Sequence, residues 1–379
     1  MDQTEVLLQE LKKARAANDR KSEYMFLGEL ANTHFRRADY EEAVQVYEQA
    51  LAVAREIEDL QSIAATLVNL AKVYSASGKV QEAIEISREA LDIAQAIGDR
   101  RAESNALGTL GLGFDELGEV NEAISYHERA LNIADELGDD ASKGNELSNL
   151  ANAYANLGRF ADAINFFERA LESYERTDDR RGKSATLGNL GNAYAVQGQY
   201  DHAVDFYRQA LSNANTELGE AHPATAQILN NLGILLRDQG SYEEARPLIE
   251  RALAINEKLL GEEHPYTAST LHNLALLLRD QGSYEEARPL FERALAINEK
   301  VLGEEHPDTA STLHNLALLL YDQGSYEEAR PLYERALAIY EKVFGEEHPD
   351  TKLVRQNLTT LDTQQRERSI GFFRRLFTK

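Results

Sequence analysis

The sequence of 379 residues contains no cysteine and no tryptophan. Without cysteine there is no disulfide framework, no thiolate metal site and no thiol nucleophile, and a reducing compartment fits such a chain best. No stretch approaches the length and apolarity of a membrane span, and acidic residues interrupt the first 20 positions, where a signal peptide would need an apolar core. We therefore expect a cytoplasmic protein.

Basic residues are scarce relative to acidic ones. The chain has 40 lysine and arginine residues against 64 aspartate and glutamate residues, which gives a net charge of -24. Such a charge repels nucleic-acid phosphates and raises the local concentration of cationic partners. We expect no nucleic-acid partner. A basic protein or peptide is one interpretation of the acidic excess, and solubility alone is the other.

A repeating unit runs through most of the chain, with a period of 40 residues that later becomes 42. Residues 268–309 and 310–351 differ at only four positions, so duplication built this part of the array. In the first unit Ala38 takes the place of the recurring glycine. That glycine stands at Gly78, Gly118, Gly158, Gly198, Gly240, Gly282 and Gly324.

Each unit is predicted to form two helices separated by the glycine turn. Apolar and small residues recur at helical spacing on both sides of the turn, as at Ala163, Phe167 and Ala170 after it. The small residues would let the two helices cross closely. In three late units a serine followed three residues later by glutamate predicts a capping box at the start of the second helix: Ser241, Ser283 and Ser325.

The units resemble the tetratricopeptide repeat, in which Leu-Gly or Leu-Ala is followed by an aromatic residue or leucine and then by alanine, aromatic and alanine. The 40-residue units, such as LGNLGNAYAVQGQYDHAVDFYRQAL from Leu187 to Leu211, are similar to adaptors of the LGN/Pins type. The 42-residue units resemble those of kinesin light chain. The resemblance implies an all-α fold, a right-handed α-solenoid in which the first helix of each hairpin lines a concave groove that binds proteins or peptides.

The predicted organisation has four parts. Residues 1–23 form an N-terminal capping helix, and residues 24–351 form eight repeats, with the 40-residue period reaching to about 221. Residues 352–365 form a C-terminal capping helix, and residues 366–379 form a basic tail. Capping units with a polar outer face are what such stacks require for solubility.

Asparagine recurs at one position of the first helix. Asparagine is a mediocre helix former, so its recurrence there asks for another reason. Its amide both donates and accepts hydrogen bonds, and a row of amides can pair with an extended peptide backbone, as the resemblance also implies. The alternative is an amide bonded to the neighbouring helix or simply copied by duplication. The row comprises Asn69, Asn149, Asn189, Asn231, Asn273 and Asn315, with Asn357 in the cap and Glu29 and Thr109 as exceptions.

Further polar residues are expected on the same face, because residues three or four apart along a helix share a side. They would set specificity, or each is a solvated polar residue without a role. The chaperone-binding members of the family use a lysine in the first helix, and here that position holds Gly28, Val68 and Gly108, so we expect no chaperone tail as ligand. The face is completed by Asn105, Asn145, Asn152, Asn192, Asn230, His272, His314, Arg237 and Arg279.

No motif in the sequence predicts catalysis, a cofactor or a metal site. Histidine precedes proline once per late unit, but equivalent residues of successive units lie too far apart to share one metal ion. Gly182-Lys183-Ser184 lacks the earlier glycine of a phosphate loop, since Thr177 stands there. We expect a protein that is not an enzyme. The four histidines, at His222, His264, His306 and His348, are predicted to lie at helix starts.

The C-terminal tail is basic and aromatic, with five basic residues and one glutamate between Arg366 and Lys379. One face of a short helix there would suit an anionic membrane or a partner's groove. Two alternatives are a helix folded back on the last repeat and a segment that enters the acidic groove of its own or a neighbouring chain. The residues of this face and its basic flank are Ile370, Phe372, Phe373, Arg374, Arg375, Leu376 and Phe377.

The sequence thus predicts an adaptor or scaffold that holds a protein or peptide segment in the groove of a repeat array. One alternative is a regulatory sensor in which a bound peptide controls an output partner. Another is an adaptor recruited to membranes through residues 366–379. The oligomeric state stays open.

Overall fold

The structure is a computed structural model that describes residues 3–217 and 219–377, with the side chains of residues 4–217 and 219–366. Eighteen helices and no strand occur in these residues, so the predicted all-α fold is confirmed. None of the helices in the described ranges is both long enough and apolar enough to cross a membrane. The chain divides into two compact units, unit 1 (Met1–Gln197) and unit 2 (Gly198–Lys379), which are described separately.

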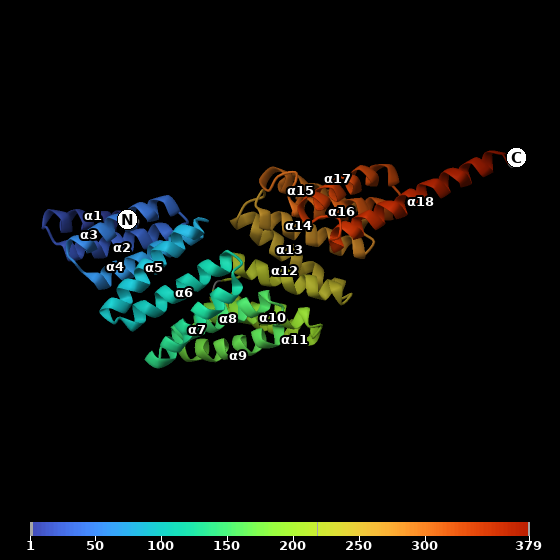
Figure 1. Cartoon of the computed structure of the whole chain (residues 1–379). Coiled ribbons are helices and arrows are strands. Elements are labelled where there is room, and N and C mark those ends of the chain that lie inside the picture. Colours follow the sequence, from blue (N-terminus) through green and yellow to red (C-terminus); the bar gives the residue numbers. More distant parts are fainter. Residues whose placement is uncertain (1–2, 218, 378–379) are drawn as a thin grey trace. The chain divides into compact units, whose positions relative to one another are not determined.

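Unit 1 consists of successive antiparallel helices, which form hairpins (Figure 1). The first helices of its repeats are α2, α4, α6, α8 and α10, and α1 stands before them in the place of a second helix. The bounds are α1 Gln3–Ala16, α2 Arg20–Arg36, α3 Tyr40–Glu56, α4 Leu60–Ala76, α5 Val80–Ile97, α6 Arg100–Glu116, α7 Val120–Leu137, α8 Asp140–Asn156, α9 Phe160–Thr177 and α10 Arg180–Val196.

Unit 2 continues the same alternation, with α12, α14, α16 and α18 as first helices. The boundary between the units falls inside the fifth repeat, between α10 and α11. The bounds are α11 Tyr200–Glu217, α12 Pro223–Asp238, α13 Tyr242–Leu259, α14 Pro265–Asp280, α15 Tyr284–Val301, α16 Pro307–Asp322, α17 Tyr326–Phe344 and α18 Pro349–Phe377.

The turn between the two helices of a repeat requires a left-handed backbone conformation. Gly78 has a φ of +78° in this turn, a conformation that glycine adopts without a steric penalty. Ala38 adopts the same conformation with a φ of +62°, which costs roughly 1 kcal/mol for a residue with a Cβ atom. The recurring glycine identified in the sequence therefore has a backbone role.

First helices begin differently in the two units. In unit 1 aspartates serve as N-caps, and Asp59 accepts a hydrogen bond from the backbone N–H of Ser62. In unit 2 the N-cap is a histidine before proline, and the His264 Nδ1 atom accepts from the N–H of Tyr266 at 3.1 Å. The prediction that the His-Pro histidines lie at helix starts is confirmed for the three N-caps at His222, His264 and His306.

The predicted capping boxes of the second helices are wrong. Ser241 is the N-cap of α13, but its side chain makes no capping hydrogen bond, and the same holds for Ser283 and Ser325. The glutamate three residues later has another partner. In α15, a carboxylate oxygen of Glu286 lies 2.9 Å from the guanidinium group of Arg246 on the preceding second helix, α13. These glutamates therefore connect neighbouring repeats.

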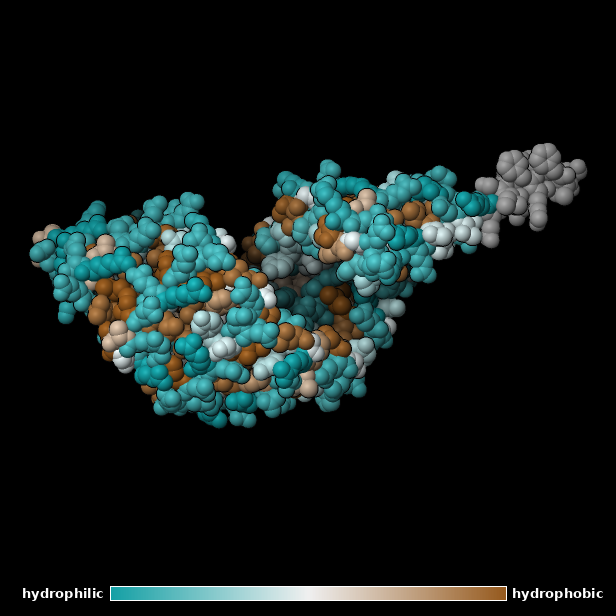
Figure 2. Space-filling view, viewed as in Figure 1, coloured by the Kyte–Doolittle hydropathy of each residue, from teal (hydrophilic) through white to brown (hydrophobic). Residues whose placement is uncertain are grey.

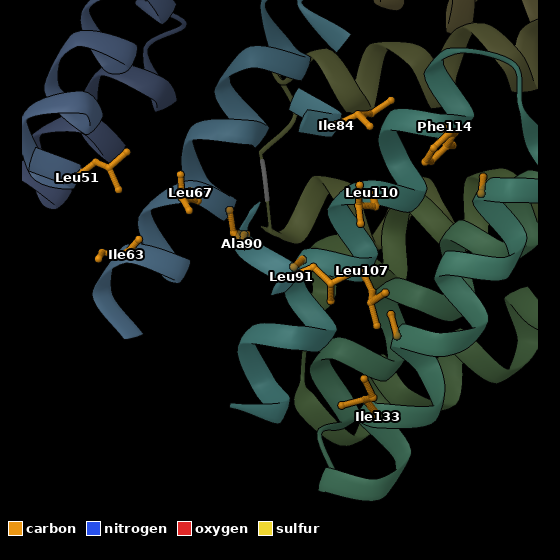
Figure 3. Close-up of a cluster of buried hydrophobic side chains, with 14 of the residues drawn as sticks. Leu51, Ile63, Leu67, Ile84, Ala90, Leu91, Leu107, Leu110, Phe114 and Ile133 are labelled. Atoms are coloured by element: carbon orange, nitrogen blue, oxygen red, sulfur yellow. The ribbon is translucent and has the colours of Figure 1, made fainter. Parts of the chain in front are cut away.

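In unit 1 buried side chains form clusters that span neighbouring repeats. In unit 1 one cluster of buried side chains extends from Leu51 on α3 through Leu67 on α4 and Leu110 on α6 to Ile133 on α7 (Figure 3). Burying a leucine or isoleucine side chain stabilises a fold by about 1.5–3 kcal/mol. Ala163 and Ala170 are fully buried on α9, where small side chains let the helices approach closely.

The last helix, α18, resembles a first helix without its partner. Val354 and Leu361 are fully buried, as they would be in a complete repeat. At the positions where Leu313 and Leu320 of α16 are buried, α18 carries Arg355 and Asp362. The helix continues without a turn to Phe377, so the predicted cap and tail share one helix. The side chains of the predicted tail residues, from 367 onward, lie outside the described residues.

Candidate functional site

The first helices of unit 1 present a polar face, which we call the unit-1 face. Its residues are exposed or half-buried, and most of them are asparagines. Figure 2 shows hydrophilic residues over most of the surface in view, with hydrophobic residues gathered over α4–α6. The unit-1 face comprises Asn69, Lys72, Asn105, Leu112, Asn145, Asn149, Asn152, Asn189 and Asn192.

Three amides of the unit-1 face have no partner within the described part of the chain. The side chains of Asn69, Asn105 and Asn149 make no hydrogen bond there. Two others are occupied: the Asn189 amide donates to the Asn152 carbonyl oxygen at 3.1 Å, and the Asn145 carbonyl oxygen accepts from the Tyr174 hydroxyl at 3.0 Å. Free donors and acceptors therefore recur on α4, α6 and α8.

In unit 2 the equivalent asparagines bind the preceding repeat. Asn273 Nδ2 donates to Asn230 Oδ1 at 3.2 Å, and Asn315 Nδ2 lies 3.3 Å from His272 Nε2. Asn357 Nδ2 lies 2.9 Å from His314 Nε2, one repeat further along. The first asparagine of this series, Asn231, is half-buried on α12. In unit 2 the asparagine row therefore corresponds to the second interpretation of the sequence, an amide bonded to the neighbouring helix.

The hydrogen bonds around His272 define its protonation. The Thr312 hydroxyl donates to the carbonyl of Asp308 and accepts from Asn298 Nδ2, so His272 Nδ1 must be the donor toward Thr312. His272 Nε2 is then free to accept from Asn315. Because Nε2 can accept a hydrogen bond only when it carries no proton, this arrangement requires a neutral ring. Burial, together with the nearby arginines and His314, lowers the pKa of His272 to about 4.

Two arginines near the turns, Arg237 and Arg279, are less accessible than the sequence predicted. Their side chains are only 15% and 18% exposed. Arg237 pairs with Asp238 at 2.6 Å, and Arg279 pairs with Asp280 at 2.9 Å. Because each arginine is paired with an aspartate, the two contribute little net positive charge to the surface of the first helices of unit 2.

A buried charged cluster in unit 1 was not predicted from the sequence. His127 on α7 is fully buried, with Nδ1 at 2.7 Å from Glu146 and Nε2 at 3.5 Å from Asp115. Burial opposes the charge, but the hydrogen bonds and charges of the two carboxylates outweigh it and raise the pKa of His127 to about 9. Gly108 and Gly111 leave room for these side chains, because a Cβ atom at either position would overlap Glu146 or His127.

Comparison of the repeats would have revealed this cluster. His127 stands where Phe167 stands one repeat later, and Glu146 stands where Thr186 stands. Lys72 of the unit-1 face belongs to the same electrostatic environment: partial desolvation of its ammonium group by the surrounding protein lowers its pKa, and the charge of Glu146 opposes this effect. Lys72 remains exposed and forms no ion pair within the described residues. It is thus a cation available to a ligand.

The described residues form no metal site. Across residues 3–217 and 219–377, no group of three or more histidine, aspartate or glutamate residues is placed to hold a metal ion. Each His-Pro histidine lies at the start of a different first helix.

Comparison with known proteins identifies the family. The family model of the tetratricopeptide repeat matches residues 24–96, 62–136, 145–216, 224–300, 266–342 and 308–370. The chain belongs to the tetratricopeptide-repeat family. The resemblance predicted from the sequence is therefore confirmed, and the architecture is that of a protein-interaction scaffold, because such solenoids present extended binding surfaces. No curated protein matches the sequence.

Several solved structures are similar to the chain. BtubC (BKLC) from P. vanneervenii is 26% identical, with a TM-score of 0.53 over 61% of this chain and 94% of that one. A STAND signal-transduction ATPase with a tetratricopeptide repeat sensor from Pyrococcus horikoshii is 15% identical, with a TM-score of 0.68 over 95% and 55%. The apo form of the quorum sensor NprR from B. thuringiensis is 16% identical, with a TM-score of 0.54 over 92% and 99%. The last two likenesses concern the fold alone.

Proposed function

We propose that the chain is an adaptor that binds an extended peptide segment of a partner protein on the unit-1 face. The observation that carries this proposal is the set of unpartnered amides at Asn69, Asn105 and Asn149 on three successive first helices. An extended peptide backbone has both N–H and C=O groups to satisfy, and an amide side chain serves either. Asparagine within a helix disfavours the helix, so a ligand gives these residues a reason to be there.

The surroundings of the amides supply the remaining contacts. Lys72 lies on α4 one helical turn after Asn69 and offers a positive charge without a partner. Leu112 on α6 is 40% exposed and offers apolar surface. A ligand with an acidic side chain near Lys72 and an apolar side chain near Leu112 would use both. The residues of the unit-1 face therefore determine which side chains the ligand carries, and the net acidic charge of the chain acts only at longer range.

Selection of peptides from a random display library against the full chain provides a probe. Affinity is then measured by calorimetry with the tightest synthetic peptide and with the free-amide variant, N69A/N105A/N149A. Each lost hydrogen bond costs about 1 kcal/mol, so affinity should fall on the order of a hundredfold. The matched control replaces three exposed asparagines of second helices in the same unit, N121A/N132A/N165A. Unchanged affinity in a folded free-amide variant, or an equal loss in the control, contradicts the proposal.

The same peptide distinguishes an adaptor from a peptide-responsive sensor. Solution scattering of the full chain with and without the peptide should give the same profile if the chain is an adaptor. Ligand-dependent compaction would instead favour the sensor, because a ligand shifts a conformational equilibrium only if it binds one state more tightly.

A further inference from the structure

Two cavities in unit 2 are related by the repeat. The first, of about 190 Å³, lies between α12, the end of α13 and α14, and the second, of about 290 Å³, lies between α14, the end of α15 and α16. Most positions of their walls correspond at a distance of 42 residues: Asn256 and Leu260 in the first become Asn298 and Leu302 in the second. The duplication of the repeat therefore duplicated a cavity.

The next repeat shows what such a cavity accepts. There Tyr340 replaces the asparagine and Phe344 replaces the leucine. Tyr340 is only 6% exposed, and burial raises the pKa of its hydroxyl group. Its ring stacks on that of Phe344 with 5.7 Å between centroids. An aromatic side chain thus fits among the walls of this type of cavity.

The first cavity has the better lining for an aromatic ring. Among the described residues no charged one lines it, whereas Asp308 lines the second. Tyr266 stands in its wall with 65% of its surface exposed, and its ring lies beside that of His264 with 5.3 Å between centroids. Apolar and neutral walls with one exposed aromatic residue favour an aromatic ligand over a charged one.

A polar group inside the first cavity selects among aromatic side chains. Asn256 is 6% exposed, and its Nδ2 atom donates to the Thr270 hydroxyl at 3.0 Å. Its side-chain oxygen, Oδ1, accepts no hydrogen bond within the described residues. This oxygen is therefore an acceptor for a hydroxyl group on a bound ring.

We infer that the cavity between α12 and α14 binds a tyrosine side chain of a peptide ligand, with the phenol hydroxyl donating to Asn256 Oδ1. The inference rests on the proposed function in one respect: the tyrosine belongs to a peptide held by the chain. The ring would lie among Gln227, Leu260 and Tyr266. The neighbouring cavity, with Asp308 in its wall, takes a different side chain.

The test uses p-cresol, the tyrosine side-chain analogue, and toluene, with the full chain and ligand-observed NMR. We expect saturable binding of p-cresol and about fivefold weaker binding of toluene, because one hydrogen bond of about 1 kcal/mol is missing. The variant N256Y/L260F copies Tyr340 and Phe344 and should abolish p-cresol binding. The control N298Y/L302F fills the second cavity and should leave p-cresol affinity unchanged.

Several outcomes overturn the inference: no saturable binding of p-cresol, equal or tighter binding of toluene, retention of p-cresol binding by N256Y/L260F, or equal loss in the control. If N256Y/L260F fails to fold, Asn256→Leu removes the acceptor without filling the cavity, and the preference for p-cresol over toluene should then disappear. Retention of that preference contradicts the inference. The test needs no peptide, so its failure is separate from a failure of the free-amide variant to lose peptide affinity.

Discussion

The two units place the same residue type at equivalent positions and use it differently. In unit 2 the residue just before the asparagine is itself a partner for the next repeat, as with Asn230 and His272. In unit 1 the corresponding positions carry Val68, Ser148 or Gly188, which provide no such partner amide or ring. In unit 2 the neighbouring residue therefore supplies the partner, whereas in unit 1 Asn189 is bonded to Asn152 instead and Asn69 and Asn149 have no partner within the described residues.

Histidines of the two units also differ in their ionisation. His127 in unit 1 lies between two carboxylates and is held in its charged form. His272 in unit 2 is near arginines and accepts a hydrogen bond on Nε2, so it is held neutral. Repeats with one architecture thus contain histidines of opposite ionisation, and this difference can be tested.

The largest expected effect follows from His127→Phe, which introduces the residue found one repeat later at Phe167. It leaves Glu146 and Asp115 without a cation, and breaking a buried pair in this way costs about 3–5 kcal/mol. Amide hydrogen exchange in α6–α8 should show this loss locally.

A repaired variant provides the control for His127→Phe. Adding Glu146→Thr and Asp115→Ala, the residues found one repeat later at Thr186 and Ala155, removes both unpaired charges. The free energy of opening should return to within about 1 kcal/mol of the native value, because an apolar replacement of a buried ion pair is often neutral. If the single variant is as stable as the native chain, the charged cluster is not structural.

The pH dependence should differ in sign between the units. The pKa of His127 is raised to about 9, so its contribution is complete below the unfolded pKa of about 6.5 and is lost as the pH rises from there to about 9. The pKa values of His272 and His314 are lowered to about 4, so their contribution is present above about 6.5 and is lost as the pH falls to about 4. Each change in the free energy of unfolding is on the order of 3 kcal/mol. For His272 and His314 this value has been reduced because both side chains are partly exposed to solvent.

Region-resolved hydrogen exchange of the full chain across pH measures both effects. The repaired variant of His127 should lose the alkaline effect in α6–α8. The variant H272N/H314N, which introduces the residue found at Asn230, should lose the acidic effect in α14 and α16. A change of the same sign in both units between pH 4 and 9 would contradict this comparison.

A smaller effect concerns the longer loops of unit 2. Thr267 is fully buried, and its hydroxyl donates to the carbonyl of Gly261 at 2.8 Å, an arrangement repeated at Thr309 and Thr351. Thr267→Val keeps the shape but removes this bond and leaves the carbonyl with only the longer hydrogen bond from the N–H of His264 at 3.4 Å, which should cost about 1 kcal/mol. Chemical denaturation checks the loss, with Thr360→Val on the exposed side of α18 as the matched control. Equal effects of the two substitutions would show that the loop bond contributes nothing.

The fold was predictable because two features of the sequence indicate the same helices. Apolar residues have helical spacing within each repeat, and this spacing recurs in the other repeats. The left-handed turn at Gly78 and the N-caps at His264 and His306 were predictable from local chemistry. The capping boxes were not, because Glu286 pairs with Arg246 from the preceding repeat, and such a choice between partners depends on tertiary distance.

The position of the asparagine row on the first helices was predictable, but the hydrogen bonds of its amides were not. All the asparagines of the row lie on first helices. Their partners could not be predicted, since these depend on which side chain of the preceding repeat lies within about 3 Å. The His127 cluster was missed because the sequence reasoning followed what the repeats share, and this cluster lies where one repeat departs from the others.

The difference between free and bonded amides can be measured without any ligand. The free-amide variant N69A/N105A/N149A is compared with a bonded-amide variant, N273A/N315A/N357A, by the free energy of unfolding of the full chain. The free-amide variant should be as stable as the native chain or up to about 1 kcal/mol more stable, because alanine is the better helix former. The bonded-amide variant should lose about 2–3 kcal/mol with its three inter-repeat hydrogen bonds. Equal losses in both variants, or a loss confined to the free-amide variant, would contradict the division of the asparagine row into a binding surface and a structural ladder.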